Sequence, residues 1–307
     1  MFRNALARAR RLAHLKLGVP ASFTTLLRYD ALPRPHYAYG VYQAALQARA
    51  LGIPAITAIE FGVAGGQGLI ALENIADQVK SETGVDVRVF GFGLAKGMPV
   101  PVDHRDMSYV WAPGLFRMPL KRIRSRLKHA QLVLGDVRNT VPTFRSKFNA
   151  PPIGFVAFDL DYHSSTMAAF KLFEDEPEAT LPRVFCYFDD CIGDDAELHG
   201  PFAGELAAID DFNRANQHRK VSPIFGLRHK RLLPASWNDV MFVMHAFDHP
   251  RYSTYINPRW QPPAEKPERA SEIVVRAHLN GMRTARGVTS STPAPTPAPS
   301  APSAPGR

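Results

Sequence analysis

Short apolar runs rich in Val, Ile and Phe alternate along the chain with segments of helical periodicity. The runs predict buried strands, which we expect at 55–63, 86–92, 131–134, 153–160, 183–188, 221–225 and 240–247. Helices are expected at 67–81, 164–175 and 203–216. Because continuous apolar strands separated by helices are typical of a parallel sheet covered on both faces, the pattern predicts an α/β fold.

The two ends of the chain differ in composition from its centre. Residues 1–22 carry apolar residues at helical spacing between arginines, without the continuous apolar stretch of a secretory signal. We expect a basic amphipathic helix there that docks on the body of the protein, with contact to a membrane surface as the alternative. Residues 286–307 are rich in Pro, Ala and Ser and predict a disordered tail. The folded domain is therefore expected at 23–285.

The charge balance is basic: 37 Lys and Arg against 28 Asp and Glu give a net charge of +9 over 307 residues. One basic run, 117–128, contains no acid and is a candidate for binding an anionic acceptor, although a solvated helix face is favoured. No alternation of basic and aromatic residues indicates nucleic-acid binding. No window of about eighteen apolar residues predicts a membrane-spanning helix. Cys186 and Cys191 cannot build a disulfide framework, so we expect a reducing compartment, the cytoplasm.

Acidic residues follow two of the expected strands. Asp159 and Asp161 come after the run at 153–160, and Asp189 and Asp190 follow the run at 183–188. Carboxylates gathered at neighbouring strand ends repel one another, and a hard divalent cation such as Mg²⁺ or Ca²⁺ relieves that repulsion. Helix capping is the alternative role for these acids. His163, beside them, is a candidate general base, and a histidine that orients a neighbour is the other interpretation.

A glycine-rich turn follows the first expected strand. Glycines there let the backbone turn tightly and approach a ligand at the start of a helix. The segment EFGVAGGQG at 60–68 does not have the G-x-G-x-x-G spacing of dinucleotide-binding proteins. The later GFGLAKG at 91–97 lacks the G-K-[ST] of a P-loop.

Four motifs taken together resemble one family. In order, these are IEFGVAGGQGL, GDVRNTVPTF, FVAFDLDYHSST and VFCYFDDCIGDDAELHGPFAGELAAIDDF. The chain from about His36 to Gly226 resembles the class I S-adenosylmethionine-dependent methyltransferases, and within them the metal-dependent macrocin O-methyltransferase family. The resemblance implies a Rossmann-like seven-stranded methyltransferase sheet with helices on both faces and a cofactor pocket over the ends of the first three strands.

The resemblance also implies roles for individual residues. S-adenosylmethionine and Mg²⁺ are the implied cofactors. The segment against the methionine part and ribose matches Glu60, Gly62, Gly65 and Gly66, and the segment near the adenine matches Gly135 and Asp136. The implied Mg²⁺ ligands are Asp159, Asp189 and Asp190. The base that removes the hydroxyl proton is implied to be Asp159 or His163, and the sequence leaves that choice open.

Two positions depart from the family pattern. Relatives typically end the second strand with an acid that bonds the ribose hydroxyls, whereas this chain has Gly93. Relatives also commonly have Tyr where this chain has His163. We expect an O-methyltransferase acting on a hydroxylated small molecule such as a sugar or glycoside. A non-catalytic binding module that has lost cofactor affinity is the alternative, and a nicotinamide oxidoreductase is a third, disfavoured by the glycine spacing. A homo-oligomer is compatible with the sequence.

Overall fold

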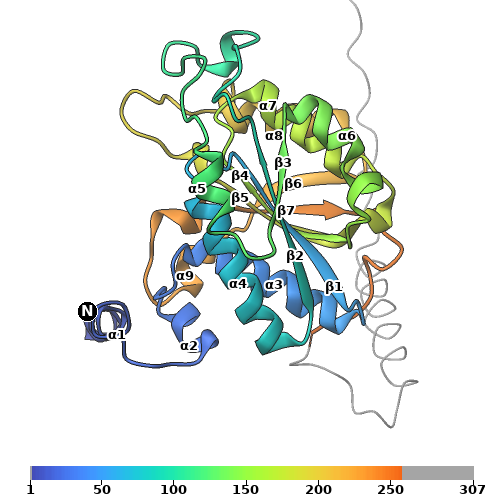
Figure 1. Cartoon of the computed structure of the whole chain (residues 1–307). Coiled ribbons are helices and arrows are strands. Elements are labelled where there is room, and N and C mark those ends of the chain that lie inside the picture. The colour runs from blue at the N-terminus through green and yellow to red at the C-terminus, as the bar shows by residue number, and fades with distance from the viewer. Residues whose placement is uncertain (1, 258–307) are drawn as a thin grey trace, which may run out of the picture. The chain divides into compact units, whose positions relative to one another are not determined.

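The computed structural model describes residues 2–257, and the side chains from residue 5 onward. Its centre is a seven-stranded sheet in the order β3-β2-β1-β4-β5-β7-β6 (Figure 1). The strands β1 to β5 are parallel, and β7 is antiparallel to both β5 and β6. Their bounds are β1 Ala55–Phe61, β2 Asp86–Gly93, β3 Gln131–Leu134, β4 Ile153–Phe158, β5 Thr180–Phe188, β6 Arg219–Pro223 and β7 Met241–Ala246.

Helices cover both faces of the sheet. Helices α3 (Pro35–Ala50) and α4 (Gln67–Thr83) lie on one face, and α6 (Val137–Phe148), α7 (His163–Phe170) and α8 (Gly204–Ala215) lie on the other (Figure 1). The predicted seven-stranded α/β sheet with helices on both faces is therefore confirmed.

The two faces are packed with different kinds of side chain. Under α3 and α4 the core is mainly aliphatic with a few aromatic rings, and α3 approaches the sheet so closely that a Cβ at Gly40 would lie 2.4 Å from the Phe155 ring. Under α6 to α8 the core is a cluster of phenylalanines, in which the Phe158 and Phe188 rings stack with centroids 4.5 Å apart. Because Phe158 and Phe188 are also register partners, the ends of β4 and β5 are held level with each other.

Shorter elements complete the described chain. Helix α1 spans Phe2–Leu17, α2 Phe23–Arg28, α5 Leu120–Arg124 and α9 Leu227–Lys230. Single 3₁₀ turns are η1 His104–Asp106, η2 Lys171–Phe173, η3 Pro177–Ala179, η4 Asp189–Cys191 and η5 Ser236–Asp239. No helix among residues 2–257 is long and apolar enough to cross a membrane. The predicted tail at 286–307 and the expected domain end at 285 lie outside the described residues.

Some elements differ from the sequence-based expectations. The sequence analysis assigned no helix to α3 or α6. Helix α3 starts without a side-chain cap, since Arg34 precedes it in the left-handed region, and α6 contains Pro142. Strand β5 begins at Thr180, three residues before the expected 183, and β6 lies two residues before the expected 221–225. These shifts leave the carboxyl end of β5, which carries the acidic residues, where it was expected.

Candidate functional site

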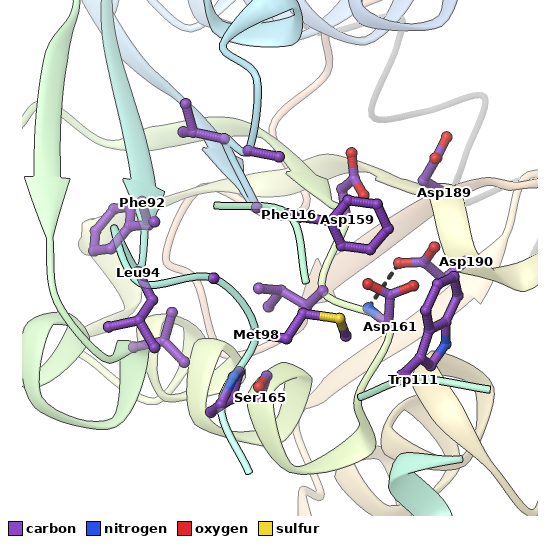
Figure 2. Close-up of a pocket in the computed structure, with 18 of the residues that line it drawn as sticks. Phe92, Leu94, Met98, Trp111, Phe116, Asp159, Asp161, Ser165, Asp189 and Asp190 are labelled. Atoms are coloured by element: carbon purple, nitrogen blue, oxygen red, sulfur yellow. Dashed lines mark hydrogen bonds between the residues drawn. The ribbon is translucent and has the colours of Figure 1, made fainter. Parts of the chain in front are cut away.

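A pocket of about 400 Å³ opens at the carboxyl ends of the parallel strands, where ligands of such sheets bind (Figure 2). Its floor comes from the turns that follow the strands, and its walls come from the segment after β2 and the segment after β5. The strand-end residues that line it are Gly62, Gly93, Gly135, Asp136, Asp159, Asp161, Asp189 and Asp190.

Three carboxylates form what we call the acidic cluster: Asp159, Asp189 and Asp190. Asp159 follows β4 and the other two follow β5, so the level ends of these neighbouring strands bring the three side chains together. One carboxylate oxygen from each lies within 4.8 Å of the others. The cluster is a candidate site for a hard cation with oxygen ligands.

The electrostatics of the acidic cluster are unfavourable for three bare charges. Burial, followed by the negative charges of Asp190 and Asp189, raises the pKa of Asp159 well above its usual range. Burial also raises the pKa of Asp190 well above its usual range, with the neighbouring Asp161 as the next cause. The pKa of Asp161 is raised to about 7, again chiefly by burial. Protons or a bound cation must therefore balance this group of carboxylates.

Behind the cluster, Glu205 on α8 holds the two acidic turns in place. The Glu205 carboxylate accepts the backbone N–H of Leu160 at 3.4 Å and that of Asp190 at 3.2 Å. The Asp190 carboxylate in turn accepts the backbone N–H of Asp161 at 2.8 Å. Glu205 is fully buried, and burial raises its pKa well above the usual range. These bonds orient Asp159 and Asp190 toward the pocket without a ligand.

Two residues that the sequence analysis did not single out, Arg34 and Tyr187, lie beside the acidic cluster. The positive charge of Arg34 lowers the pKa of both Asp159 and Glu60, against the larger effect of burial. The Arg34 guanidinium lies over the Tyr37 ring at 5.0 Å, and the Tyr187 hydroxyl bonds to the Asp189 carboxylate. Nothing in the local sequence pattern indicates Arg34, because the fold alone brings the start of α3 to the end of β4.

Glu60 is the next-to-last residue of β1 and does not line the pocket. Its Oε1 accepts a hydrogen bond from the Tyr37 hydroxyl at 2.9 Å, and its Oε2 is buried without a partner among the described residues. Burial raises the pKa of Glu60 to about 7. A Cβ at Gly68 would lie 1.6 Å from Oε1, so the start of α4 closes directly over this carboxyl. An unpartnered buried oxygen at this position is available to a donor on a ligand.

The glycine turn after β1 is set by a close approach of two strand ends. Gly62 has φ +87°, and a Cβ there would lie 1.7 Å from the backbone oxygen of Asp159. Only glycine fits this position. Gly62 lines the pocket, whereas Gly65 and Gly66 do not, and Gly66 instead precedes α4 in a left-handed conformation.

We call Gly62, Gly93 and Gly135 the glycine end of the pocket. A Cβ at Gly93 would lie 2.6 Å from the Met118 sulfur, so that methionine packs where an acidic side chain would begin. Asp136, next to Gly135, caps α6 by accepting the Arg138 N–H at 2.9 Å and forms an ion pair with Arg138. The Arg138 guanidinium holds the pKa of Asp136 below its usual range. As the sequence indicated, Gly93 leaves the end of β2 without a carboxylate.

Apolar and aromatic side chains form the wall above the acidic cluster (Figure 2). They are Leu94, Met98, Trp111, Phe116 and Met118 from the segment after β2, with Ile192 from the segment after β5. The Trp111 Nε1 is buried and has no partner among the described residues. None of the described side chains that line the pocket is Lys, Arg or His. The sequence analysis had not singled out these wall residues.

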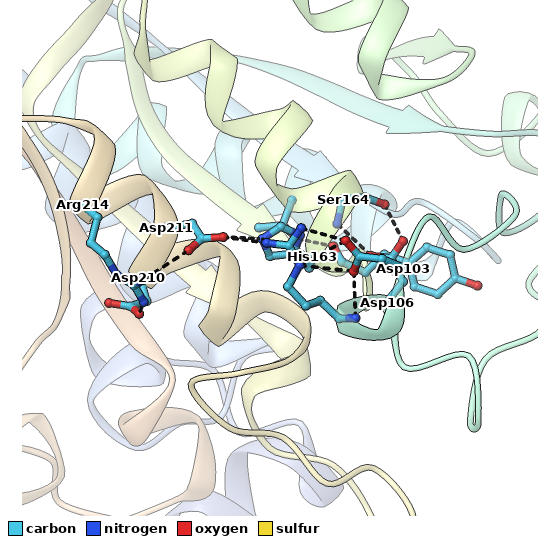
Figure 3. Close-up of polar contacts among 10 residues, drawn as sticks. Asp103, Asp106, His163, Ser164, Asp210, Asp211 and Arg214 are labelled. Atoms are coloured by element: carbon cyan, nitrogen blue, oxygen red, sulfur yellow. Dashed lines mark hydrogen bonds and ion pairs between the residues drawn. The ribbon is translucent and has the colours of Figure 1, made fainter.

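His163 takes part in a separate polar network (Figure 3). Its Nε2 lies 3.0 Å from Asp211 Oδ2 on α8 and 3.3 Å from the Arg105 guanidinium. Arg105 also forms ion pairs with Asp103 and Asp211. Next to it, Asp106 accepts the backbone N–H of Ser164 at 2.8 Å and the Ser164 hydroxyl at 2.7 Å. We call this the anchor network, because it fastens the 103–106 turn to the start of α7 and to Asp211 in the second half of α8.

Comparisons with known proteins give similar folds but no family. No protein-family model and no curated protein matches the chain. Among solved structures, the calicheamicin methyltransferase CalS11 is 21% identical with a TM-score of 0.45 over 78% of this chain and 91% of its own. The O-methyltransferase NovP is 13% identical with a TM-score of 0.47, over 79% of this chain and 98% of its own. The O-methyltransferase TomG of Streptomyces achromogenes is 12% identical with a TM-score of 0.38, over 80% of this chain and 89% of its own.

The structure sorts the residues that the resemblance singled out. Gly62, Gly135, Asp136 and the three residues of the acidic cluster line one pocket. Glu60, Gly65 and Gly66 support the turn beneath it without lining it. His163 also does not line it, because the side chain is directed at Asp211, and the placement favours the orienting interpretation over the general-base interpretation.

Proposed function

We propose that this chain is an S-adenosylmethionine-dependent O-methyltransferase that uses Mg²⁺ on a hydroxylated small molecule. The observation that carries the proposal is the convergence of the acidic cluster and the glycine end on a single pocket. An oxygen-ligand cation site beside a cradle of glycine turns is what transfer of a methyl group to a metal-bound hydroxyl requires.

The acidic cluster would hold the cation. Three carboxylates with oxygens within 4.8 Å, two of them with raised pKa values, fit a divalent ion better than they fit three free charges. Mg²⁺, when bound, supplies a positive charge that lowers the pKa of a coordinated hydroxyl and fixes its position. Glu205 and the backbone N–H groups it accepts keep the ligands oriented, which is the supporting role that outer residues have in metal sites.

The glycine end would receive the cofactor. Gly62 and Gly135 have no side chain, so a ligand can approach the backbone there closely. The neighbouring Phe92, Met118 and Val137 offer apolar surface to a purine and a thioether. The acidic residues that line the pocket suit a ligand that carries a sulfonium and an ammonium group. The fit is incomplete only after β2, where Gly93 and Met118 replace the acid.

The acceptor would lie between the acidic cluster and the apolar wall. Trp111 and Phe116 offer flat aromatic surface, and Ile192 adds an aliphatic one. Because no described lining residue is basic, the proposed acceptor is an uncharged hydroxylated molecule such as a sugar or glycoside rather than an anionic one. The acceptor oxygen would form its bond to the methyl carbon as the carbon–sulfur bond breaks, and a carboxylate, Asp159 or Asp161, would take the hydroxyl proton.

One observation favours a second candidate, a binding module without catalysis. Met118 fills the place of the ribose-binding acid, so the fold could persist without cofactor affinity. Calorimetric titration of S-adenosylmethionine, with and without Mg²⁺, separates the two. We expect binding in the micromolar range for the methyltransferase. Absence of heat at millimolar ligand under both conditions would exclude the methyltransferase and leave the binding module.

A further inference from the structure

Helix α1 contacts the body of the protein through a mainly polar side. Ala7 is its one described buried residue, at 4% exposure. The Arg10 guanidinium donates a hydrogen bond to the Tyr29 hydroxyl at 2.7 Å, and the His14 ring lies 6.1 Å from the Tyr29 ring. These three residues lie within one arc of about 60° on a helix with 3.6 residues per turn. The docking expected from the sequence therefore uses a mainly polar strip of the helix, and the leucines of α1 lie outside that strip.

Most of the apolar residues of α1 are exposed. Ala5, Leu6, Ala9, Leu12 and Leu17 fall within an arc of about 140° that borders the docking side; Lys16 also lies in this arc, and Leu15 lies outside it. Leu6, Leu12 and Leu17 are 58%, 50% and 77% exposed. A surface helix of a globular protein normally turns such an arc toward the core. Here the arc faces outward, and no described residue covers it.

The charge around this arc is uniformly positive. Residues 1–29 contain six Lys or Arg and no Asp or Glu, and none of the described residues among them forms an ion pair. A hollow of about 400 Å³ beside the helix is lined by Leu6 and Ala7 from α1 and by Arg28, Tyr29, His229, Arg231 and Leu232. Arg231 is neutralised by Asp30, which leaves Arg28 and His229 to face an anion there.

We propose that α1 binds the surface of an anionic membrane, with its apolar arc among the acyl chains and its arginines at the phosphate headgroups. A basic helix with an outward apolar arc is the pattern of helices that lie in the membrane interface. Two basic helices from two copies of the chain would repel each other, whereas anionic headgroups attract them, and the hollow at Arg28 offers room for a headgroup phosphate. The inference does not depend on the proposed methyl transfer.

Co-sedimentation of the full chain with vesicles tests this. We expect binding to vesicles that contain phosphatidylglycerol and at least tenfold weaker binding to pure phosphatidylcholine. Leu12→Asp with Leu17→Asp should reduce binding at least tenfold, and Arg8→Glu with Lys16→Glu should reduce it by about fivefold for each charge removed. Matched controls are Leu198→Asp, at another exposed leucine, and Lys147→Glu on α6, both expected to bind like the parent.

The outcomes are distinguishable because all four substituted positions of α1 are exposed and circular dichroism checks the fold. Binding that survives the leucine substitutions but not the charge reversals would mean adsorption by charge alone, and it would overturn insertion of the arc. Equal binding to both vesicle types would overturn the requirement for anionic lipid. A dimer in light scattering that the leucine substitutions dissociate, without vesicle binding, would assign the arc to a second copy instead.

Discussion

The acidic cluster and the glycine end lie in the same pocket but differ in how completely the surrounding residues support them. Every carboxylate of the cluster has its supporting structure in place: level strand ends, the Glu205 bonds and the nearby Arg34. The glycine end has the tight turns but no carboxylate after β2, and Met118 occupies the space. The difference teaches that a strand-end site is assembled residue by residue, so one half can persist while the other changes.

The energetic consequences of the two halves are also different. Carboxylates removed from water destabilise the folded state when no counter-charge is present, so the acidic cluster would lower the stability of the fold if it had no ligand. Gly93 and Met118 are uncharged and do not lower the stability when the pocket is empty. We therefore expect the cluster to be the half that function depends on most.

The largest expected effect is the loss of the proposed cation site. Asp189→Ala removes one of the three proposed ligands and should lower turnover on the order of a thousandfold, because several kcal/mol of charge stabilisation at the hydroxyl would be lost. Steady-state kinetics and Mg²⁺ titration measure it. Asp195→Ala, an exposed acid on the same segment, is the control and should act like the parent. Parent-like turnover of Asp189→Ala would refute the metal-assisted mechanism.

The next effect tests the glycine end from the opposite direction. Gly93→Asp combined with Met118→Ala restores a carboxylate after β2 and clears the sulfur that would lie 2.6 Å from its Cβ. A charge-assisted bond to the ribose hydroxyls should raise affinity for S-adenosylmethionine about ten- to a hundredfold by calorimetry. Gly93→Asp alone should gain less affinity than the double variant, because the Met118 side chain has to move aside first. Unchanged affinity of the double variant would mean that other groups already hold the ribose.

The sequence predicted one half of this comparison better than the other. Asp159, Asp189 and Asp190 directly follow apolar runs, and the shared edge of a parallel sheet then brings them together. The absence of an acid at Gly93 was visible in the sequence, but its replacement by Met118 was not. Met118, Trp111 and Phe116 belong to a segment without periodicity, whose path over the pocket depends on long-range contacts such as the anchor network.

A third test uses the pH dependence of stability. In the folded chain the pKa of Asp161 and of Glu60 is about 7, and burial holds those of Asp159, Asp190 and Glu205 well above their usual range. A carboxyl with a raised folded-state pKa binds more protons when folded than when unfolded. Its stabilisation is therefore full at low pH and falls as pH rises, by up to about 1.4 kcal/mol per pH unit.

His36, whose pKa is lowered to about 3, has the opposite effect below pH 6.5, so the informative range lies above it. Between pH 6.5 and 8 without divalent cations, we expect the melting temperature to fall by several degrees. Saturating Mg²⁺ should remove most of this decrease, and Asp190→Asn should reduce it. A melting temperature that is independent of pH and of Mg²⁺ would show that the cluster is not charged in the way described.

The smallest expected effect concerns His163, which lies outside both halves of the pocket. Its Nε2 lies 3.0 Å from Asp211 and 3.3 Å from Arg105, so the ring holds the 103–106 turn. Because both contacts occupy Nε2, this nitrogen is not free to accept a proton from an acceptor hydroxyl. We expect His163→Gln to lower kcat by less than about tenfold and to leave the pH–rate profile in place, since general-base catalysis is worth a hundredfold or more. Asp211→Asn removes the same contact from the other side and should reproduce the effect, with a similar loss of melting temperature. The opposite result would be a hundredfold loss of kcat in His163→Gln but not in Asp211→Asn, with loss of the pH dependence that a general base gives to the rate. That result would mean that His163 is the base and that the anchor network, as well as the acidic cluster, takes part in catalysis.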